Sequence, residues 1–187
     1  MTEPKETLEI QNVVASTTVG QELHLEELAD DLSASEYNPE HFPGLVYRIQ
    51  SPKAATLIFR SGKAVCTGAK SVENVHRAVT IVFDELRELG VEVDADPEIT
   101  VQNMVLSGDL GQQLNLNAIA IGLGLKNIEY EPEQFPGLVY RVSPPDVVVL
   151  MFGSGKAVIT GAKSIENAKT ALETVQSQLQ EVDLINR

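Results

Sequence analysis

One stretch of sequence decides the fold because it occurs twice: YNPEHFPGLVYRI spans residues 37–49, and YEPEQFPGLVYRV spans residues 130–142. The similarity extends well beyond it, since residues 37–74 and 130–167 share 25 identities in 38 ungapped positions. The period is about half the chain, and there are only two copies. This arrangement indicates two similar subdomains related by a pseudo-twofold axis, as in a fused dimer, rather than a solenoid.

The two copies extend upstream with a small change of offset. IQNVV at 10–14 matches VQNMV at 101–105 at an offset of 91, whereas the later motifs match at 93. The second copy therefore carries two additional residues, which we place within residues 122–127. We assign residues 1–96 to the N-terminal repeat and residues 97–187 to the C-terminal repeat.

Each copy ends in a long amphipathic helix. Apolar residues recur at steps of three and four over residues 72–89 and again over residues 165–182, which is the period of one helix face. Ser71 and Ser164 are the expected N-caps, and Gly90 is expected to end the first helix.

The remainder of each copy predicts short strands separated by the turn signals FPG, SP and SGK. A shorter helix is expected near residues 22–32, with a counterpart near 116–121. The expected strands of the first copy, each with a counterpart in the second, are residues 8–17, 45–49, 54–59 and 64–69. Adjacent strands followed by a helix predict an α+β fold with an antiparallel sheet rather than a parallel βαβ one.

The charge balance of the chain is acidic but uneven. Fourteen basic and 27 acidic residues among 187 give a net charge of −13, which usually argues against nucleic acid or anionic membranes as partners. However, residues 37–74 carry a net +3 and residues 130–167 a net −1, so the rest of the chain carries −15. The acidity lies mostly outside the two most similar blocks.

Several classes of protein are disfavoured by composition. The single Cys66 excludes an internal disulfide and favours a reducing compartment, and the three histidines are too scattered for a zinc site. No apolar stretch is long enough to span a bilayer, so we expect no membrane association. SGKA at 61–64 lacks the upstream glycine of a phosphate loop, and no nucleophile and base pair is evident. We expect neither catalytic residues, nor a metal, nor a cofactor.

The expected sheet would have one uncovered face. The strands are apolar on both faces, while one long and one short helix per copy suffice to cover only one face of a sheet of eight to ten strands. The pattern alone leaves three explanations open. The copies pack on each other as a sandwich, a homodimer buries the face, or the face binds a ligand.

The paired QNVV and QNMV, FPGLVYR, SGKAV and TGAKS motifs resemble the TATA-box-binding protein family, in fixed order from about Leu8 to Val182. The resemblance implies one saddle-shaped, highly curved antiparallel sheet that binds DNA on its concave face and carries helices on its convex face. It implies a general transcription initiation factor, not an enzyme, that binds and bends A·T-rich promoter DNA through the minor groove. It further implies recruitment of transcription factor B and, indirectly, of RNA polymerase.

The resemblance also assigns roles to paired residues. Two phenylalanines 17 residues apart in each copy correspond to the wedges that the family inserts between base steps. Phe83 falls outside this pattern and is expected in the core. The predicted wedges are Phe42, Phe59, Phe135 and Phe152.

Further pairs correspond to groove and phosphate contacts. An Asn pair and a Thr pair would face the minor-groove acceptors, and apolar residues would form the floor of the site. The predicted minor-groove residues are Asn12, Asn103, Thr67, Thr160, Val14, Val65, Val105, Val158, Leu57 and Leu150. The predicted phosphate contacts are Arg48, Lys63, Lys70, Arg141, Lys156 and Lys163.

Glu131 and Glu133 precede Phe135 in a turn that, in the family, contacts transcription factor B. Gln134 stands where the family has an apolar residue. The resemblance is closest to archaeal members, which implies a cytoplasmic, nucleoid-associated protein, or a nuclear one in a eukaryote. A homodimer through the concave face is expected in the absence of DNA.

Two functions from other classes stay open at this stage. One is the non-catalytic part of an enzyme such as a DNA glycosylase, although the duplication leaves no room for a catalytic domain. The other is a carrier of apolar ligands or a dimerisation module. Protection of an A·T-rich duplex in a footprint would distinguish DNA binding from a carrier or a dimerisation module.

Overall fold

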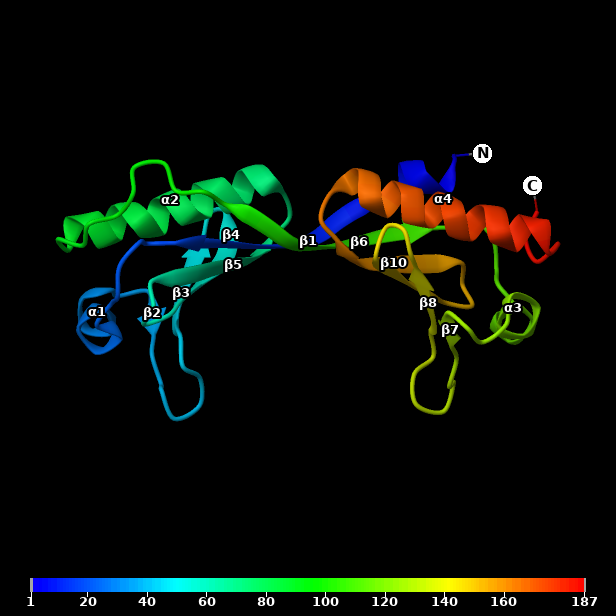
Figure 1. The fold of residues 1–187 in the computed structure, drawn as a ribbon, viewed down its shortest axis with the longest axis horizontal. Helices are drawn as coiled ribbons and strands as arrows, with labels where there is room; N and C mark the ends of the chain where they lie inside the picture. The colour runs from blue at the N-terminus through cyan, green and yellow to red at the C-terminus, as the bar shows by residue number, and fades with distance from the viewer. Residues whose placement is uncertain (1, 187) are drawn as a thin grey trace. The chain divides into compact units, whose positions relative to one another are not determined.

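The computed structural model describes residues 2–186 (Figure 1). The chain forms two compact units. The first unit is Asn12–Gln102, and the second unit comprises the residues up to Gln11 together with those from Asn103 onward. The N-terminal segment is therefore packed with the second repeat, although it belongs to the first repeat in sequence.

The first unit contains a five-stranded antiparallel sheet in the order β2-β3-β4-β5-β1. Neighbouring strands are mostly consecutive in sequence, and β1 returns to pair with β5. The strands are β1 (Glu9–Thr18), β2 (Ser35–Glu36), β3 (Leu45–Gln50), β4 (Lys53–Ile58) and β5 (Lys63–Ala69). Residues 9–11 of β1 belong to the second unit.

The second unit repeats this topology in the order β6-β10-β9-β8-β7. The strands are β6 (Thr100–Asp109), β7 (Ile128–Glu129), β8 (Leu138–Val142), β9 (Val147–Met151) and β10 (Lys156–Ala162). The predicted α+β class, the tandem repeat and the antiparallel pairing are confirmed.

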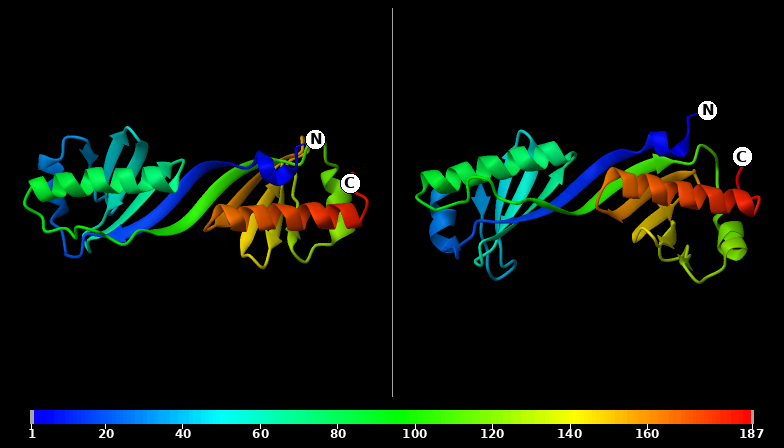
Figure 2. Two further views of the ribbon diagram at one scale, coloured as in Figure 1. Left: turned by 90° about the horizontal axis from the view of Figure 1, so that it is seen from above. Right: turned by 45° about the horizontal axis from the view of Figure 1, so that its top comes forward.

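One long helix covers one face of each sheet (Figure 2). α2 (Val72–Glu88) packs on β4 and β5, and α4 (Ile165–Glu181) packs on β8, β9 and β10. Alternate residues of the strands face the helix and are buried, as Ala64 and Cys66 are in β5. The alternation shifts by one residue at Gly68, where the register of the β1–β5 ladder also shifts, so Ala69 is buried as well. The intervening residues face the opposite side and are half-exposed. We call this second side the open face of each unit.

The two long helices begin and end as their sequences predict. The Ser71 hydroxyl accepts a hydrogen bond from the Asn74 amide at 3.0 Å, and the Ser164 hydroxyl accepts one from the Asn167 amide at 3.2 Å. An N-cap of this kind contributes about 1 kcal/mol. Gly90 lies just beyond α2 with φ +88°, a conformation that glycine adopts without strain. Phe83 lies on the buried side of α2 and is fully buried, as expected.

The shorter helices show where the two additional residues lie. α1 (Leu25–Asp31) has seven residues and α3 (Leu116–Leu123) has eight. Three residues separate α1 from β2, whereas four separate α3 from β7. One additional residue therefore extends the helix and the other lengthens the following loop. Both fall within residues 122–127.

Three short elements were not expected from the sequence. The edge strands β2 and β7 have two residues each, which is too short for an alternating pattern to show. A 3-10 helix, η1 (Pro4–Thr7), packs on α4, where the Lys5 ammonium donates to the Glu173 carboxylate at 2.8 Å. Within residues 2–186, no helix combines the length and apolarity needed to cross a membrane.

Candidate nucleic-acid interface

The ten predicted minor-groove residues all lie on the open faces and are half-exposed. In the first unit, Leu57 is directly opposite Val65 in the β4–β5 ladder. In the second unit, Leu150 is directly opposite Val158 in the β9–β10 ladder. The larger side chains therefore form a matching apolar surface on each unit, on the side that the long helix does not cover.

Two asparagines occupy equivalent positions, one in each unit, with one orientation. The Asn12 Oδ1 atom accepts a hydrogen bond from the Gly68 amide at 2.7 Å, and the Asn103 Oδ1 atom accepts one from the Gly161 amide at 2.6 Å. A backbone N–H can only donate, so these bonds fix which amide atom is oxygen. The glycines adopt φ of +90° and +87°, which other residues rarely reach.

The asparagine amide nitrogens are directed toward the threonines of the open face. Asn12 Nδ2 lies 3.4 Å from Thr67 Oγ1, and Asn103 Nδ2 lies 3.4 Å from Thr160 Oγ1. An NH₂ group has two hydrogens, so each asparagine keeps a donor beyond this weak contact. Each unit thus presents an oriented hydrogen-bond donor on its apolar open face.

The four predicted wedge phenylalanines form two aromatic pairs. The ring centroids of Phe42 and Phe59 are 5.9 Å apart at 64°, and those of Phe135 and Phe152 are 5.9 Å apart at 71°. Phe42 is 37% exposed and Phe135 is 40% exposed, which is unusual for residues of this size. Each pair joins the loop before a strand to the turn after the next strand. The duplicated spacing therefore brings two distant rings together in each unit.

A glycine lies beneath each aromatic pair, where a side chain would displace the rings. A Cβ atom at Gly44 would lie 2.7 Å from a carbon of Phe42 and 3.0 Å from one of Phe59. A Cβ atom at Gly137 would lie at the same distances from Phe135 and Phe152. The FPG motif therefore does more than form a turn, because its glycine allows the two rings to meet.

The predicted phosphate contacts are all exposed and lie around the open faces. Lys63 and Lys156 begin β5 and β10, and Lys70 and Lys163 follow the same strands. Arg48 is 4.0 Å from the Glu36 carboxylate, and the Arg141 guanidinium is 3.4 Å from the Glu129 carboxylate. These two ion pairs link β3 to β2 and β8 to β7. A phosphate that binds either arginine would compete with its glutamate.

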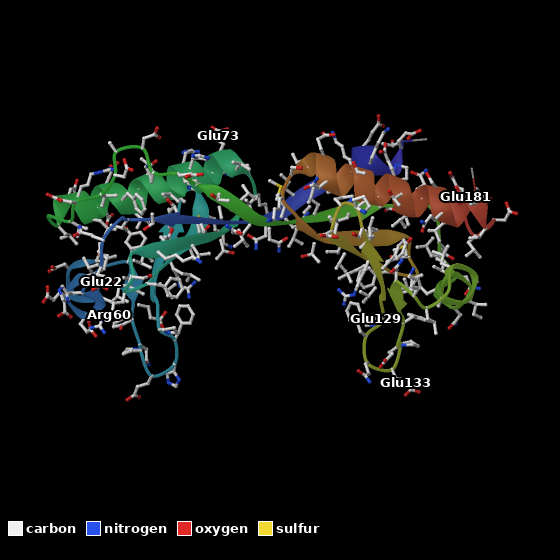
Figure 3. The ribbon with its side chains drawn as sticks, viewed as in Figure 1. Glu22, Arg60, Glu73, Glu129, Glu133 and Glu181 are labelled. Atoms are coloured by element: carbon white, nitrogen blue, oxygen red, sulfur yellow. The ribbon has the colours of Figure 1, made fainter. Side chains whose placement is uncertain are left out.

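Glu131 and Glu133 lie in the exposed loop between β7 and β8, where Figure 3 labels Glu133. The Glu131 carbonyl accepts hydrogen bonds from the amides of Gln134 and Phe135, both at 2.9 Å, which close the turn. The side chains of Glu131 and Gln134 line a shallow hollow of about 180 Å³ next to Phe135. Backbone hydrogen bonds therefore fix the turn, and its two carboxylates are exposed.

Shifted pKa values occur on the helix-covered side. Burial raises the pKa of the Cys66 thiol and of the Tyr140 hydroxyl. Burial and a hydrogen bond with Glu85 raise the pKa of Tyr47 to about 12. These three shifts follow from packing against the long helices rather than from an arrangement of catalytic groups, whereas the raised pKa of Lys5 follows from its contact with Glu173. Across residues 2–186, no cluster of three or more Cys, His, Asp or Glu side chains could hold a metal ion.

Sequence reasoning missed the residues that support the predicted ones. Gly68 and Gly161 hold the asparagines, Gly44 and Gly137 admit the aromatic pairs, and Glu36 and Glu129 pair with the arginines. Each of these residues recurs at the repeat offset, as the predicted ones do. The duplication was therefore the one signal that could have found them.

The chain matches the family model described as "Transcription factor TFIID (or TATA-binding protein, TBP)" over residues 7–89 and 98–182. TATA-box-binding protein E of Halobacterium salinarum is 64% identical over 186 residues, which cover all of both chains. TATA-box-binding protein 1 of Haloferax volcanii is 65% identical and is covered over 98% of its length. The solved structure of Methanococcus jannaschii TBP superposes with a TM-score of 0.85 at 54% identity, covering 93% of this chain and 98% of that one.

These similarities place the fold and its open faces in a family of DNA-binding transcription factors rather than of enzymes. The chain belongs to the TATA-binding protein family of transcription factors. The relatives named above are archaeal, and the predicted archaeal type is confirmed.

Proposed function

We propose that the chain is a general transcription initiation factor that binds and bends A·T-rich promoter DNA through the minor groove. The observation that carries this proposal is the oriented asparagine of each unit within an apolar open face. In the minor groove, A·T and T·A pairs present only acceptors, whereas G·C adds the guanine amino group. An amide nitrogen can donate to the acceptors of an A·T or T·A pair, whereas the guanine amino group of a G·C pair obstructs it.

The apolar part of the open faces favours a widened minor groove over an undistorted one. Valine and leucine side chains contact sugars and base edges only if the groove is opened and flattened against them. Aromatic wedges lower the cost of opening because they replace the stacking lost at a kinked step, which is worth a few kcal/mol per step. Phe42 and Phe135 are exposed enough to reach a base step.

The basic residues around the open faces would position the duplex by binding its phosphates. Arg48 and Arg141 would leave their glutamate partners to do so. In the absence of DNA, two copies of the chain would cover the apolar faces by dimerising through them. Since the DNA target is chromosomal, the protein would work in the archaeal cytoplasm, associated with the nucleoid.

Recruitment would follow DNA binding. Glu131 and Glu133 would bind basic groups of transcription factor B, which in turn would recruit RNA polymerase. The exposed carboxylates and the fixed backbone of the turn support this contact.

Binding to duplexes of different composition tests the proposed function. The chain is expected to protect an A·T-rich site in a footprint and to bring the ends of that duplex closer together. A G·C-rich duplex of equal length should show neither effect. Equal binding to both duplexes would contradict minor-groove recognition, and the carrier and dimerisation hypotheses predict no protection at all.

Replacing Asn12 and Asn103 with Asp tests the donor role without disturbing the fold. Aspartate keeps the oxygen that accepts from Gly68 or Gly161 but loses the NH₂ donor and gains a negative charge. We expect each substitution to weaken binding roughly 5- to 150-fold, which corresponds to about 1–3 kcal/mol for a base contact. Fluorescence anisotropy would measure the Kd, and unchanged affinity would remove the asparagines from the interface.

The dependence of affinity on salt is expected to be shallow. Six phosphate contacts alone would give a slope of log K against log salt of about −5. Arg48 and Arg141 leave carboxylates behind when they bind phosphate, and those carboxylates would take up cations, which opposes the release from DNA. We therefore expect a slope clearly shallower than −5 in a KCl titration. A slope of −5 or steeper would show that the acidic groups do not influence binding.

A further inference from the structure

The two lysines that begin β5 and β10 have the same backbone setting. The Phe59 amide donates to the Lys63 carbonyl at 2.9 Å, and the Phe152 amide donates to the Lys156 carbonyl at 3.0 Å. The preceding glycines adopt φ of +88° and +93°. Each unit therefore presents one lysine at the same place beside its aromatic pair. We call the surroundings of Lys63 the first edge and those of Lys156 the second edge.

The residue opposite each lysine differs in charge. Lys63 is opposite Thr18 in the β1–β5 ladder, and Lys156 is opposite Asp109 in the β6–β10 ladder. Directly opposite residues have Cβ atoms about 4.5–5.5 Å apart, so their side chains share one electrostatic environment. The first edge has a neutral hydroxyl where the second has a carboxylate.

The turn does not require the charge of Asp109. Asp109 Oδ1 accepts a hydrogen bond from the Gly111 amide at 2.8 Å. Thr18 Oγ1 accepts the equivalent bond from the Gly20 amide at 3.1 Å. A neutral oxygen therefore closes the same turn, and the carboxylate adds only its charge to this edge.

A second carboxylate and a missing arginine increase the difference. Glu9 lines an open groove of about 560 Å³ together with Asp109, Lys156 and Phe152. The position matching Glu9 at the repeat offset is Thr100, in the first unit. In the turn before the lysine, the first unit has the exposed Arg60 and the second has Gly153.

The charges of the two edges therefore have opposite signs. Arg60 and Lys63 give the first edge +2, whereas Lys156 with Asp109 and Glu9 gives the second edge −1. Glu22, the acidic residue nearest to Thr18 along the chain, lines a separate hollow with α1 and residues 89–91. No ion pair within 4.0 Å engages Arg60, Lys63 or Lys156 in the described part of the chain, so the edges differ in their nearby charges rather than in a direct ion pair.

We propose that the first edge is the main phosphate-binding edge, and that Asp109 and Glu9 weaken phosphate binding at the second. This inference rests on the proposed function, and it names residues that decide which unit holds the DNA backbone more tightly. Because the minor-groove residues of the two units are nearly identical, the difference in charge would orient the chain wherever the two ends of a site differ in electrostatic potential.

A duplex with one neutral end tests the inference directly. The core of the duplex is an A·T palindrome, so both orientations make the same base contacts. Methylphosphonates replace the charged phosphates at one end only. A dye attached through Glu40→Cys marks the first unit, since Cys66 is buried and does not react, and energy transfer to one duplex end reports the orientation.

We expect the first unit to occupy the charged end at least about threefold more often than the neutral end, because each surface charge contributes a small factor and the edges differ by three charges. The triple variant Asp109→Thr, Glu9→Thr and Arg60→Gly gives both edges one lysine and no other charge. It is expected to bind in both orientations equally. The threonine introduced by Asp109→Thr would keep the turn hydrogen bond, as Thr18 does in the first unit.

A matched control changes the net charge without changing the edges. Glu73 and Glu181 are exposed on the long helices, away from the open faces (Figure 3), and replacing both with Thr should leave the bias as it is. If the triple variant does not fold, the reverse variant Thr18→Asp with Thr100→Glu should also reduce the bias.

Equal occupancy of both orientations by the parent chain, a bias in the opposite sense, or a bias that survives in the triple variant would each overturn the inference. Failure to bind the palindrome at all would instead contradict the proposed function. The two failures are therefore distinguishable.

Discussion

Replacing Phe42, Phe59, Phe135 and Phe152 with Ala is expected to remove most of the DNA bend and to lower affinity at least about 100-fold. Burial of one such side chain contributes about 1.5–3 kcal/mol, and the variant loses four. Without the rings, nothing replaces the stacking lost at an opened base step. Energy transfer between dyes on the two duplex ends measures the bend, and a four-alanine variant that bends DNA like the parent would exclude the wedge role.

The same substitutions should cost the fold comparatively little. Each edge-to-face pair stabilises the protein by about 0.5–1.5 kcal/mol beyond the apolar area that it buries, and none of the four rings is fully buried. Phe83→Ala provides the contrast, because Phe83 is fully buried and its truncation should cost about 3–5 kcal/mol. Thermal unfolding separates the two outcomes. The four-alanine variant should unfold at a higher temperature than the Phe83→Ala variant, but it should bend DNA less than the Phe83→Ala variant does.

Replacing Glu131 and Glu133 with Arg reverses two charges. This variant is expected to lose the ternary complex with transcription factor B but to bind DNA alone as the parent chain does. Both side chains are exposed, so the substitutions leave the core unchanged. Loss of a buried charge pair costs about 2–5 kcal/mol, which predicts at least about a 30-fold weaker ternary complex. A gel shift with both proteins and the A·T-rich duplex measures it.

The first repeat supplies the matched control for this experiment. Asn38 and Glu40 occupy the positions of Glu131 and Glu133 at the repeat offset. Changing both to Arg alters the net charge in the same direction but in the other unit. The ternary complex should persist in this variant. If the control and the Glu131 and Glu133 variant behave alike, net charge rather than a specific contact determines recruitment.

Internal duplication made most of the fold predictable. Equal spacing in two copies allowed each helix and strand to be identified twice, and the caps at Ser71 and Ser164 follow directly from local chemistry. The two-residue strands β2 and β7 escaped prediction because pairing with β3 and β8, rather than their own pattern, makes them strands. Local sequence carries no signal for such tertiary pairing.

The site residues could be predicted because they recur in both repeats and resemble those of a known family. The residues that hold them in place could not be predicted, because their role depends on distances between strands. Nothing local shows that Gly68 must donate to Asn12, or that Gly44 must lack a side chain for Phe42 to meet Phe59. The contrast between Thr18 and Asp109 is visible in the sequence. Its meaning appears only when the ladder places these residues opposite the two lysines.

A duplex in which inosine·cytosine pairs replace the A·T pairs tests the central claim most directly. Inosine lacks the 2-amino group, so an I·C pair resembles A·T in the minor groove and G·C in the major groove. The account predicts that affinity and bend on the I·C duplex stay close to those on the A·T duplex, while the G·C duplex binds at least about 100-fold more weakly. Binding to the I·C duplex as weak as to G·C would show that the chain does not recognise its target through the minor groove.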